Sequence, residues 1–237
     1  RRLGRNFRHV GSEDEFAAAE PLDPRWQAFW DGERWSLLWL EPPEHTRIRK
    51  LVAAAFTPRS VEALREPCAE LARELLPTGH CELLRDYAQP YSIAVICRLL
   101  GVPTDRGRDL LDWSHAMVKM YELDTTLEQA EHATRAAAEF TEYVESLIEE
   151  RRREPRDDMV TRLAEVEVEG KRLTDAQIVS TMIVLLNAGH EATVNVTGNG
   201  WWSLFRNPAE LVRLREDRSL LPTAVEELMR WDTPLQM

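Results

Sequence analysis

The sequence predicts a mainly α-helical fold organised around one long central helix at residues 174–206. Apolar residues recur three or four positions apart along most of the chain, as on the buried face of a helix. Proline and glycine separate the successive runs, which is where helices end. Hydrophobic residues make up 43% of the chain, enough for a core. No repeat or linker divides it, so we expect residues 1–237 to form a single domain.

The first 40 residues have the weakest helical pattern. We expect one short helix at residues 13–20, before Pro21. Four tryptophans follow at spacings of four, five and four: Trp26, Trp30, Trp35 and Trp39. Tryptophan usually packs in a core, so core packing is favoured over a ligand-binding role for these rings.

Six further helices are expected before the central one, each bounded by proline, glycine or a capping residue. They cover residues 42–56, 57–76, 84–100, 105–120, 126–153 and 157–167. Gly170 separates the last of them from the central helix. Two short helices follow the central one. The first begins at Pro208 with Asn207 as its N-cap, and the second covers residues 223–231.

The central helix has clear signals at both ends. Thr174 and Gln177 have the spacing of a capping box, in which each side chain bonds the other residue's backbone amide. Asn207-Pro208 ends the run, which would span roughly 50 Å at the rise of an α-helix. Apolar residues cover much of the circumference of its first half, so we expect this half to be buried.

Small and polar residues interrupt the middle of this apolar helix. The small residues are Ala188, Gly189 and Ala192, and the polar ones are Asn187, His190, Glu191 and Asn195. Ala188 and Ala192 are four residues apart and share a face. We therefore expect a shallow recess, next to Glu191, in which a flat group can lie against the backbone.

Two interpretations of this segment remain open. It is either a close helix crossing in which Glu191 pairs with a neighbour, or a binding site, because an ionised carboxylate is rarely buried without a partner or a purpose. A zinc protease site is excluded. His190 and Glu191 begin an H-E-x-x-H pattern, but the second histidine is replaced by Val194.

Two more motifs carry charged pairs on single helix faces. In EPPEHTRIRKLVAAAFTPR, residues 41–59, His45 and Arg49 are four residues apart. Taken alone they are typical of a solvated basic face. Glu227 and Arg230 form an E-x-x-R pattern, which by itself is an ordinary ion pair on a helix.

The order and spacing of these motifs resemble the cytochrome P-450 family of haem-thiolate monooxygenases. AGHEAT, residues 188–193, is similar to the oxygen-activation motif of the family's central helix. Residues 41–59 are similar to the helix that binds the haem propionates in bacterial members, and ICRLLGVP, residues 96–103, also resembles the family. The E-x-x-R pair follows AGHEAT at the family's spacing. The resemblance implies the helical core of a cytochrome P-450 and the insertion of one oxygen atom from O₂ into a small organic substrate.

The resemblance also implies roles for individual residues. His45 and Arg49 would hydrogen-bond the propionates of haem b, iron protoporphyrin IX. Ala188, Gly189 and Ala192 would make room for the haem, and Glu191, with His190 and Thr193, would handle protons. Glu227 and Arg230 would hold the haem-binding core as structural residues. The four tryptophans and the helices over residues 105–153 would line and cover the substrate pocket.

The sequence departs from the family pattern in two ways. The family's metal ligand is a cysteine in a loop like F-x-x-G-x-H-x-C-x-G, which is absent from these residues. None of Cys68, Cys81 and Cys97 matches it, so no metal ligand is expected in this chain. Together with the missing N-terminal sheet, this predicts an internal fragment that does not form the haem-thiolate centre alone. The family also usually has Thr where this chain has Ala192, so proton delivery is expected through water, Glu191 or a substrate hydroxyl.

Charge and cysteine content limit the kinds of partner and the cellular compartment that we expect. The 30 basic and 41 acidic residues give a net charge of −11, which argues against nucleic acid as a partner. Scattered cysteines and the lack of a long apolar stretch favour a cytoplasmic protein without a membrane span. The resemblance implies a ferredoxin-type partner and its NAD(P)H-driven reductase. The alternatives are a non-catalytic helical scaffold and a small-molecule binding protein that has lost the haem site.

Overall fold

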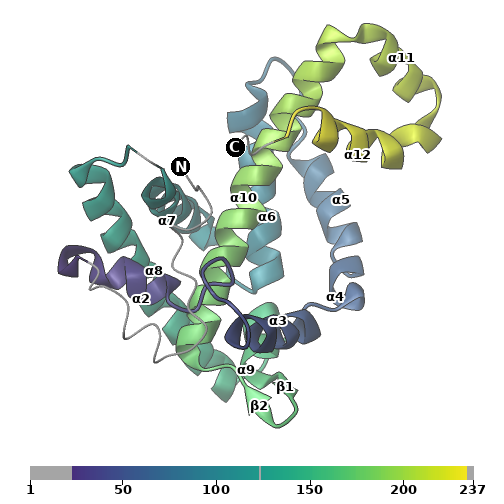
Figure 1. The fold of residues 1–237 in the computed structure, drawn as a ribbon. Coiled ribbons are helices and arrows are strands. Elements are labelled where there is room, and N and C mark those ends of the chain that lie inside the picture. Colours follow the sequence, from purple (N-terminus) through teal and green to yellow (C-terminus); the bar gives the residue numbers. More distant parts are fainter. Residues whose placement is uncertain (1–22, 123, 234–237) are drawn as a thin grey trace. The chain divides into compact units, whose positions relative to one another are not determined.

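The computed structural model describes residues 23–122 and 124–233, so the short helix expected at 13–20 lies outside the described residues. The chain divides into two compact units (Figure 1). Of the described residues, unit 1 contains 23–66, 97–122 and 124–187, and unit 2 contains 67–96 and 188–233. The mainly helical fold class is confirmed. That the chain is a single domain stays a prediction.

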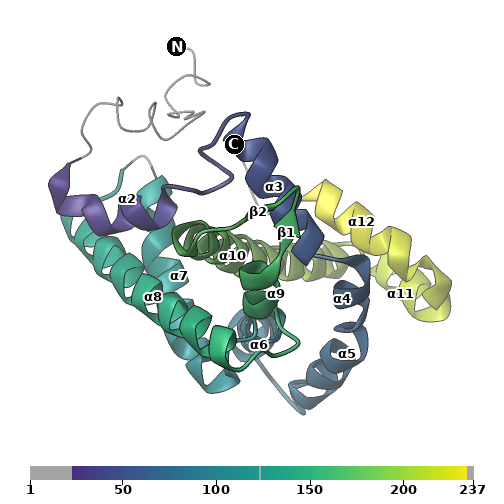
Figure 2. The same cartoon turned by 90° about the horizontal axis from the view of Figure 1, so that it is seen from below.

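Unit 1 is built around the long helix α8, Leu127–Arg153. Helices α2 (Gln27–Glu33), α7 (Gly107–Val118) and α9 (Met159–Glu165) pack against α8, and Figure 2 shows α2 and α7 beside it. The remaining elements of the unit are η1 (Pro24–Trp26), α3 (Glu44–Ala55), α4 (Pro58–Glu62), η3 (Thr104–Arg106), η4 (Lys119–Tyr121), β1 (Glu167–Val168), β2 (Lys171–Arg172) and the first part of α10 (Asp175–Arg206). Fully buried side chains from several of these elements form its core: Phe29, Ile48, Leu110, Met117, Phe140, Ile148, Ile178 and Met182.

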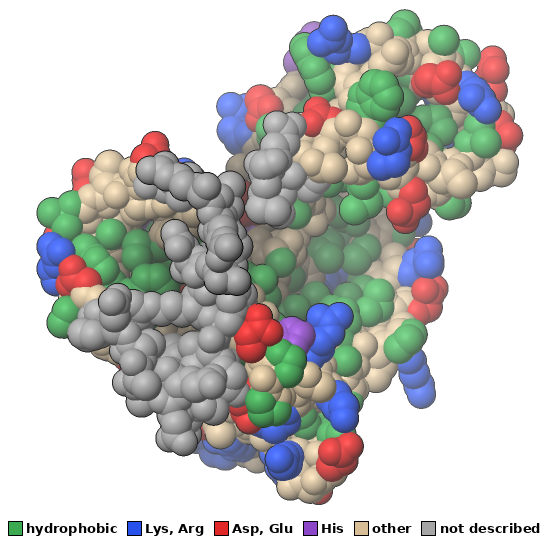
Figure 3. Space-filling view, in the orientation of Figure 1, with side chains coloured by type: hydrophobic (Ala, Val, Ile, Leu, Met, Phe, Trp, Pro, Cys, Tyr) green, Lys and Arg blue, Asp and Glu red, His purple; other side chains and the backbone are tan. Residues whose placement is uncertain are grey.

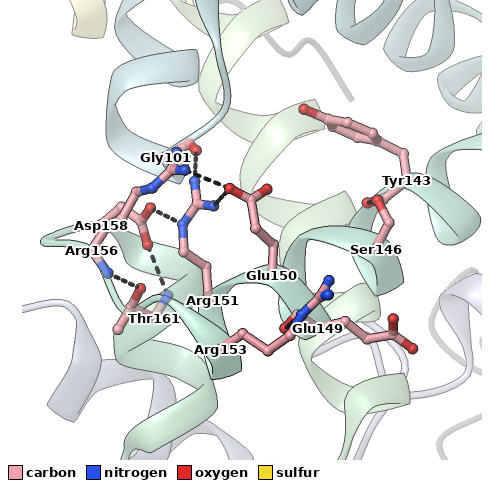
Figure 4. A network of polar contacts seen from close by, with 10 residues as sticks. All are labelled: Gly101, Tyr143, Ser146, Glu149, Glu150, Arg151, Arg153, Arg156, Asp158 and Thr161. Carbon is pink, nitrogen blue, oxygen red and sulfur yellow. Dashed lines mark hydrogen bonds and ion pairs between the residues drawn. The ribbon is translucent and has the colours of Figure 1, made fainter.

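A buried ion pair joins α8 and α9 (Figure 4). The Nε of Arg151 donates to Oδ2 of Asp158 at 2.5 Å, and its Nη2 donates to the carbonyl of Gly101 at 2.9 Å. Arg151 is 2% exposed and Asp158 is 7% exposed. Gly101 has a φ of 84°, and a Cβ there would come within 2.4 Å of the Asp158 side chain. Only glycine therefore fits at this turn.

Unit 2 contains most of helix α5 (Arg65–Glu74), the π-helical turn η2 (Leu84–Ala88), most of α6 (Gln89–Leu100) and the second part of α10. It ends with α11 (Pro208–Glu216), η5 (Arg218–Leu220) and α12 (Leu221–Trp231). The end of α10 and these last elements line a cleft of about 600 Å³. Hydrophobic side chains lie among charged ones on the surface of α11 and α12 (Figure 3).

Two prolines account for differences between the predicted and observed helices. The helix predicted at 57–76 is divided into α4 and α5, because Pro67 has no amide to bond the Ala63 carbonyl and its ring crowds that carbonyl. The helix predicted at 84–100 is observed, but its first turn, η2, is π-helical. Pro90 likewise cannot donate to the Asp86 carbonyl, which explains the irregular turn.

The helix predicted at 157–167 is wrong at its C-terminal end. It stops at Glu165, and residues 167–172 form a two-stranded antiparallel hairpin. Glu169 and Gly170 connect the strands with φ angles of 55° and 72°, as a two-residue hairpin turn requires.

The capping box of α10 is confirmed. The Gln177 amide donates to the Thr174 hydroxyl at 3.3 Å, and the Thr174 amide donates to the Gln177 side chain at 3.1 Å. Asn207 does not cap α11 through its side chain. Its side-chain amide donates to the Ser203 carbonyl at 2.9 Å instead, so it satisfies the C-terminus of α10. No helix among residues 23–122 and 124–233 is both long and apolar enough to span a membrane.

Candidate functional site

Helix α3 in unit 1 carries the first pair of predicted site residues. His45 is half-buried and Arg49 is exposed, and their spacing places them on one face. Neither side chain makes a hydrogen bond or ion pair with the described part of the chain. The neighbouring cations differ in this respect, because Arg47 pairs with Glu44 at 2.7 Å and Lys50 with Glu169 at 3.6 Å. His45 and Arg49 thus present donors that are available to an added carboxylate.

The AGHEAT segment lies in the part of α10 that belongs to unit 2. Ala188 is exposed, while Ala192 and Glu191 are half-buried. At 100° per residue, Ala188 and Ala192 are about 40° apart around the helix, and Glu191 lies about 60° from Ala188 on the other side. The helix therefore presents a strip of small side chains bordered by one carboxylate.

Gly189 has a different neighbour. A Cβ at this position would lie 2.6 Å from Cδ1 of Ile96 on α6, much closer than carbon atoms approach. On the same side, the Ser92 hydroxyl donates to the His190 carbonyl at 3.2 Å. The absence of a side chain at Gly189 is thus explained by the packing of α6 on α10. The recess expected from the sequence is left to Ala188 and Ala192, and a haem contact at Gly189 stays a prediction.

The two other predicted proton-handling residues have unequal access to solvent. His190 is 1% exposed and lies on the buried side of α10 with Val194. Thr193 is exposed, and its hydroxyl donates to the Gly189 carbonyl at 2.9 Å, as threonine often does within helices. Of the three residues, Glu191 has a carboxylate that is only half-buried, whereas His190 is buried and Thr193 carries a hydroxyl.

Glu227 and Arg230 form the predicted pair on α12. Arg230 Nε and Nη2 donate to the two carboxylate oxygens, each at 2.7 Å. Both side chains are more than half exposed. The hydrogen bond from Arg230 lowers the pKa of Glu227. Their role in holding a haem-binding core stays a prediction.

A buried carboxylate in unit 1 was not predicted from the sequence. Glu33, at the end of α2, is 2% exposed and accepts a hydrogen bond from the Trp39 indole at 2.9 Å. Burial raises the pKa of Glu33, and the nearby Trp39, Tyr121 and Ser36 donors oppose this rise. Burial, and next the charge of Glu33, raise the pKa of the Tyr121 phenol. No local signal in the sequence marks Glu33, because its burial depends on the packing of α2 against distant segments, including α8 and Ser180 of α10.

The cysteines are dispersed. Cys68 is half-buried, Cys81 is exposed and Cys97 is buried. Burial raises the pKa of the Cys97 thiol to about 11, so it is poorly suited to bind a metal as a thiolate. Among the residues that the structure describes, no three His, Cys, Asp or Glu side chains are grouped as a metal would need.

The chemistry of these residues fits haem on two counts. His45 and Arg49 offer unpaired donors of the kind that bind propionate carboxylates. Ala188 and Ala192 keep a strip of α10 low enough for a flat apolar ring. The first pair belongs to unit 1 and the second to unit 2, and each pair is described within its own unit.

Comparisons with known proteins agree with this chemistry. The cytochrome P450 family model matches residues 108–227. Cytochrome P450 107B1 of Saccharopolyspora erythraea is 39% identical over 199 residues, which are 82% of this chain and 47% of that protein. Vitamin D(3) 25-hydroxylase of Pseudonocardia autotrophica is 37% identical over 239 residues, covering 99% of this chain and 55% of that protein.

A solved structure has a similar fold. The crystal structure of P450BioI in complex with an acyl carrier protein ligated to hexadec-9Z-enoic acid matches with a TM-score of 0.86 and 29% identity. The match covers 96% of this chain and 58% of that one. The chain spans about half the length of the curated relatives it matches.

Proposed function

Because this chain belongs to the cytochrome P450 family, we propose that the protein containing it is a haem-dependent monooxygenase that inserts one oxygen atom from O₂ into a small organic substrate. The observation that carries this proposal is the AGHEAT segment of α10, with small residues beside a half-buried carboxylate. The names of two relatives, a vitamin D(3) 25-hydroxylase and a 6-deoxyerythronolide B hydroxylase, support hydroxylation as the reaction.

Haem b, when bound, supplies the oxygen chemistry, and the protein supplies binding, orientation and protons. Arg49 would grip a propionate with two parallel N–H donors, and His45 would add a third. Ala188 and Ala192 would admit the ring. We assign the iron's thiolate ligand to none of Cys68, Cys81 and Cys97, since none lies in a loop of the family's type.

Proton handling falls to Glu191. Ala192 has no hydroxyl, and the Thr193 hydroxyl already donates to the Gly189 carbonyl. A carboxylate on a half-buried helix face can take a proton from solvent and pass it inward by rotating its side chain. Water or a substrate hydroxyl would complete the path.

Electrons would come from a ferredoxin-type partner and its reductase, which draw on NAD(P)H, in the cytoplasm. The basic side of α3 away from His45 and Arg49 supports this proposal, because Arg47 and Lys50 lie there on a protein of net charge −11. Opposite charges at such a surface speed association and select the partner.

The test is the absorbance of the full-length protein after reduction in the presence of carbon monoxide. The expected result is a thiolate-type Soret band, with haem retention reduced in His45→Ala and Arg49→Ala. Arg59→Ala, which removes an exposed cation from the neighbouring helix α4, is the matched control and should retain haem. A full-length protein without haem absorbance would favour the helical scaffold or the haem-free small-molecule binding protein.

A further inference from the structure

Unit 1 contains a carboxylate for which the described residues supply no positive charge. Glu33 is 2% exposed, and the groups that affect its pKa besides burial are the neutral donors Trp39, Tyr121 and Ser36. The cation nearest in sequence, Arg34, has its guanidinium over the Trp35 ring at 5.7 Å. Buried carboxylates are normally paired with a cation, because taking an unpaired charge out of water is costly.

The polar groups around Glu33 also have unused hydrogen-bonding capacity. Oε1 of Glu33 and both polar side-chain atoms of Asn187 are buried without a hydrogen-bond partner among the residues described. Asn187 is 9% exposed and comes from α10, immediately before the AGHEAT segment. Tyr121 lies close enough to both Glu33 and Asn187 for them to affect its pKa. Unsatisfied buried polar atoms are rare in folded proteins, so such a group indicates a missing partner.

Two of the groups beside Glu33, Trp39 and Tyr121, belong to a cluster of four aromatic rings in contact, which we call the aromatic set: Phe29, Trp30, Trp39 and Tyr121. Their centroids are 5.0 Å apart for Phe29 and Trp30, 6.4 Å for Trp30 and Trp39, 6.4 Å for Trp39 and Tyr121, and 6.2 Å for Phe29 and Tyr121. Each ring of the set therefore contacts two others. Tyr121 is 39% exposed, so the set reaches the surface. Aromatic faces attract cations, and a group of them is the usual binding site for substituted ammonium ions.

We propose that Glu33, Asn187 and the aromatic set form a subsite for a positively charged amino group of the substrate. The Glu33 carboxylate would pair with the ammonium ion, the rings would surround its alkyl substituents, and Asn187 would orient the adjoining polar atoms. The substrate class is therefore an organic amine with an apolar body. This deepens the proposed function and rests on it.

The proposed ion pair also predicts that binding of the cation depends on pH. A proton and an ammonium ion compete for the Glu33 carboxylate, so lowering the pH weakens binding of the cation. The neighbours recorded for the carboxylate, Trp39, Ser36 and Tyr121, and also Asn187, are neutral at pH 7. Glu33 is thus the group on which this competition depends.

The experiment is isothermal titration calorimetry on the full-length protein with two probes of equal shape, phenyltrimethylammonium and tert-butylbenzene. The quaternary ammonium has no lone pair with which to coordinate iron, so haem ligation does not contribute. Salt at physiological concentration screens weak binding to the acidic surface. The test variant is Glu33→Gln. The matched control is Asp31→Asn, which removes an exposed negative charge from the same helix.

The expected result is that the cation binds about 10-fold more tightly than the neutral probe. This ratio should fall to about one in Glu33→Gln and stay unchanged in Asp31→Asn. Equal binding of both probes by the unmodified protein, or an unchanged ratio in Glu33→Gln, would overturn the proposal. If Glu33→Gln does not fold, the unmodified protein decides: its affinity for the cation alone must weaken as the pH is lowered. If the full-length protein shows no haem spectrum, the monooxygenase proposal fails. The ratio of the two probe affinities can still be measured, so the two proposals are tested separately.

Discussion

The indole nitrogen of Trp39 donates a hydrogen bond to the Glu33 carboxylate at 2.9 Å, within a site where Glu33 is almost fully buried. Hydrogen bonds from neutral donors such as this one do not offset the cost of burying an ion. Burial accordingly raises the pKa of Glu33 above its ordinary value of 4.5. The folded protein therefore holds this proton to a higher pH than the unfolded chain does.

The raised pKa of Glu33 predicts a stability that depends on pH. The contribution of this group is fully present below the unfolded pKa and is lost as the pH rises through the folded pKa. Glutamine has the same shape and stays neutral, so Glu33→Gln should melt close to the unmodified protein at pH 4.5 and above it at pH 8. Thermal unfolding of the full-length protein at both pH values measures this. A difference that shrinks with rising pH, or an equal effect of Asp31→Asn, would contradict it.

The ion pair of Arg151 and Asp158 predicts a large loss of stability when one partner is removed. Arg151→Ala leaves the Asp158 carboxylate buried without its cation and should lower the free energy of unfolding by about 3–5 kcal/mol. Arg153→Ala, in the same helical turn but exposed, should change it by about 0.5 kcal/mol or less. Urea unfolding of both variants makes the comparison, and equal effects would rule out the buried pair as a main stabilising contact.

The close approach of Gly189 to Ile96 predicts that Ile96→Val partly offsets the loss of stability caused by Gly189→Ala. Gly189→Ala forces a Cβ toward Cδ1 of Ile96 and should cost about 1–3 kcal/mol. Ile96→Val removes that Cδ1 and by itself should cost about 0.5–1.5 kcal/mol. The double variant should be more stable than the sum of the two effects predicts, by at least about 0.5 kcal/mol. Additive costs, with an altered haem spectrum in Gly189→Ala, would instead place the haem against Gly189.

The half-buried Glu191 predicts a slow variant that still binds haem. In the full-length enzyme, Glu191→Ala should lower turnover about 100-fold, the usual effect of losing a proton-transfer group. Ala192→Thr should be tolerated, because it places a threonine hydroxyl at the position where the family usually has one. Substrate oxidation per haem measures both, and normal product formation by Glu191→Ala would count against the proton role.

Much of the helical pattern could be predicted because local signals determine it. The capping box at Thr174 and Gln177 and the proline at position 208 mark the ends of α10 correctly. The break before Pro67 is also local, and the rules for proline would have predicted it. The hairpin at 167–172 is too short for strand periodicity to reveal.

The Glu33 site could not be predicted, because its burial depends on distant packing. Glu33 follows Gly32 in a polar stretch that is typical of an exposed turn. The packing of α2 on α8, and the hydrogen bond from the Ser180 hydroxyl on α10 to the Gly32 carbonyl at 2.6 Å, place it inside. No local pattern encodes contacts between residues separated by 148 positions.

The central proposal is that the protein containing this chain binds haem, and that α3 and the small residues of α10 each contribute contacts to it. The most direct test is a crystal structure of the full-length protein grown with haem. We predict the propionates within about 2.7–2.9 Å of the His45 and Arg49 side chains, and the porphyrin over Ala188 and Ala192. A structure in which a side chain fills the space beside Ala188 and Ala192, and no porphyrin lies there, would contradict the account.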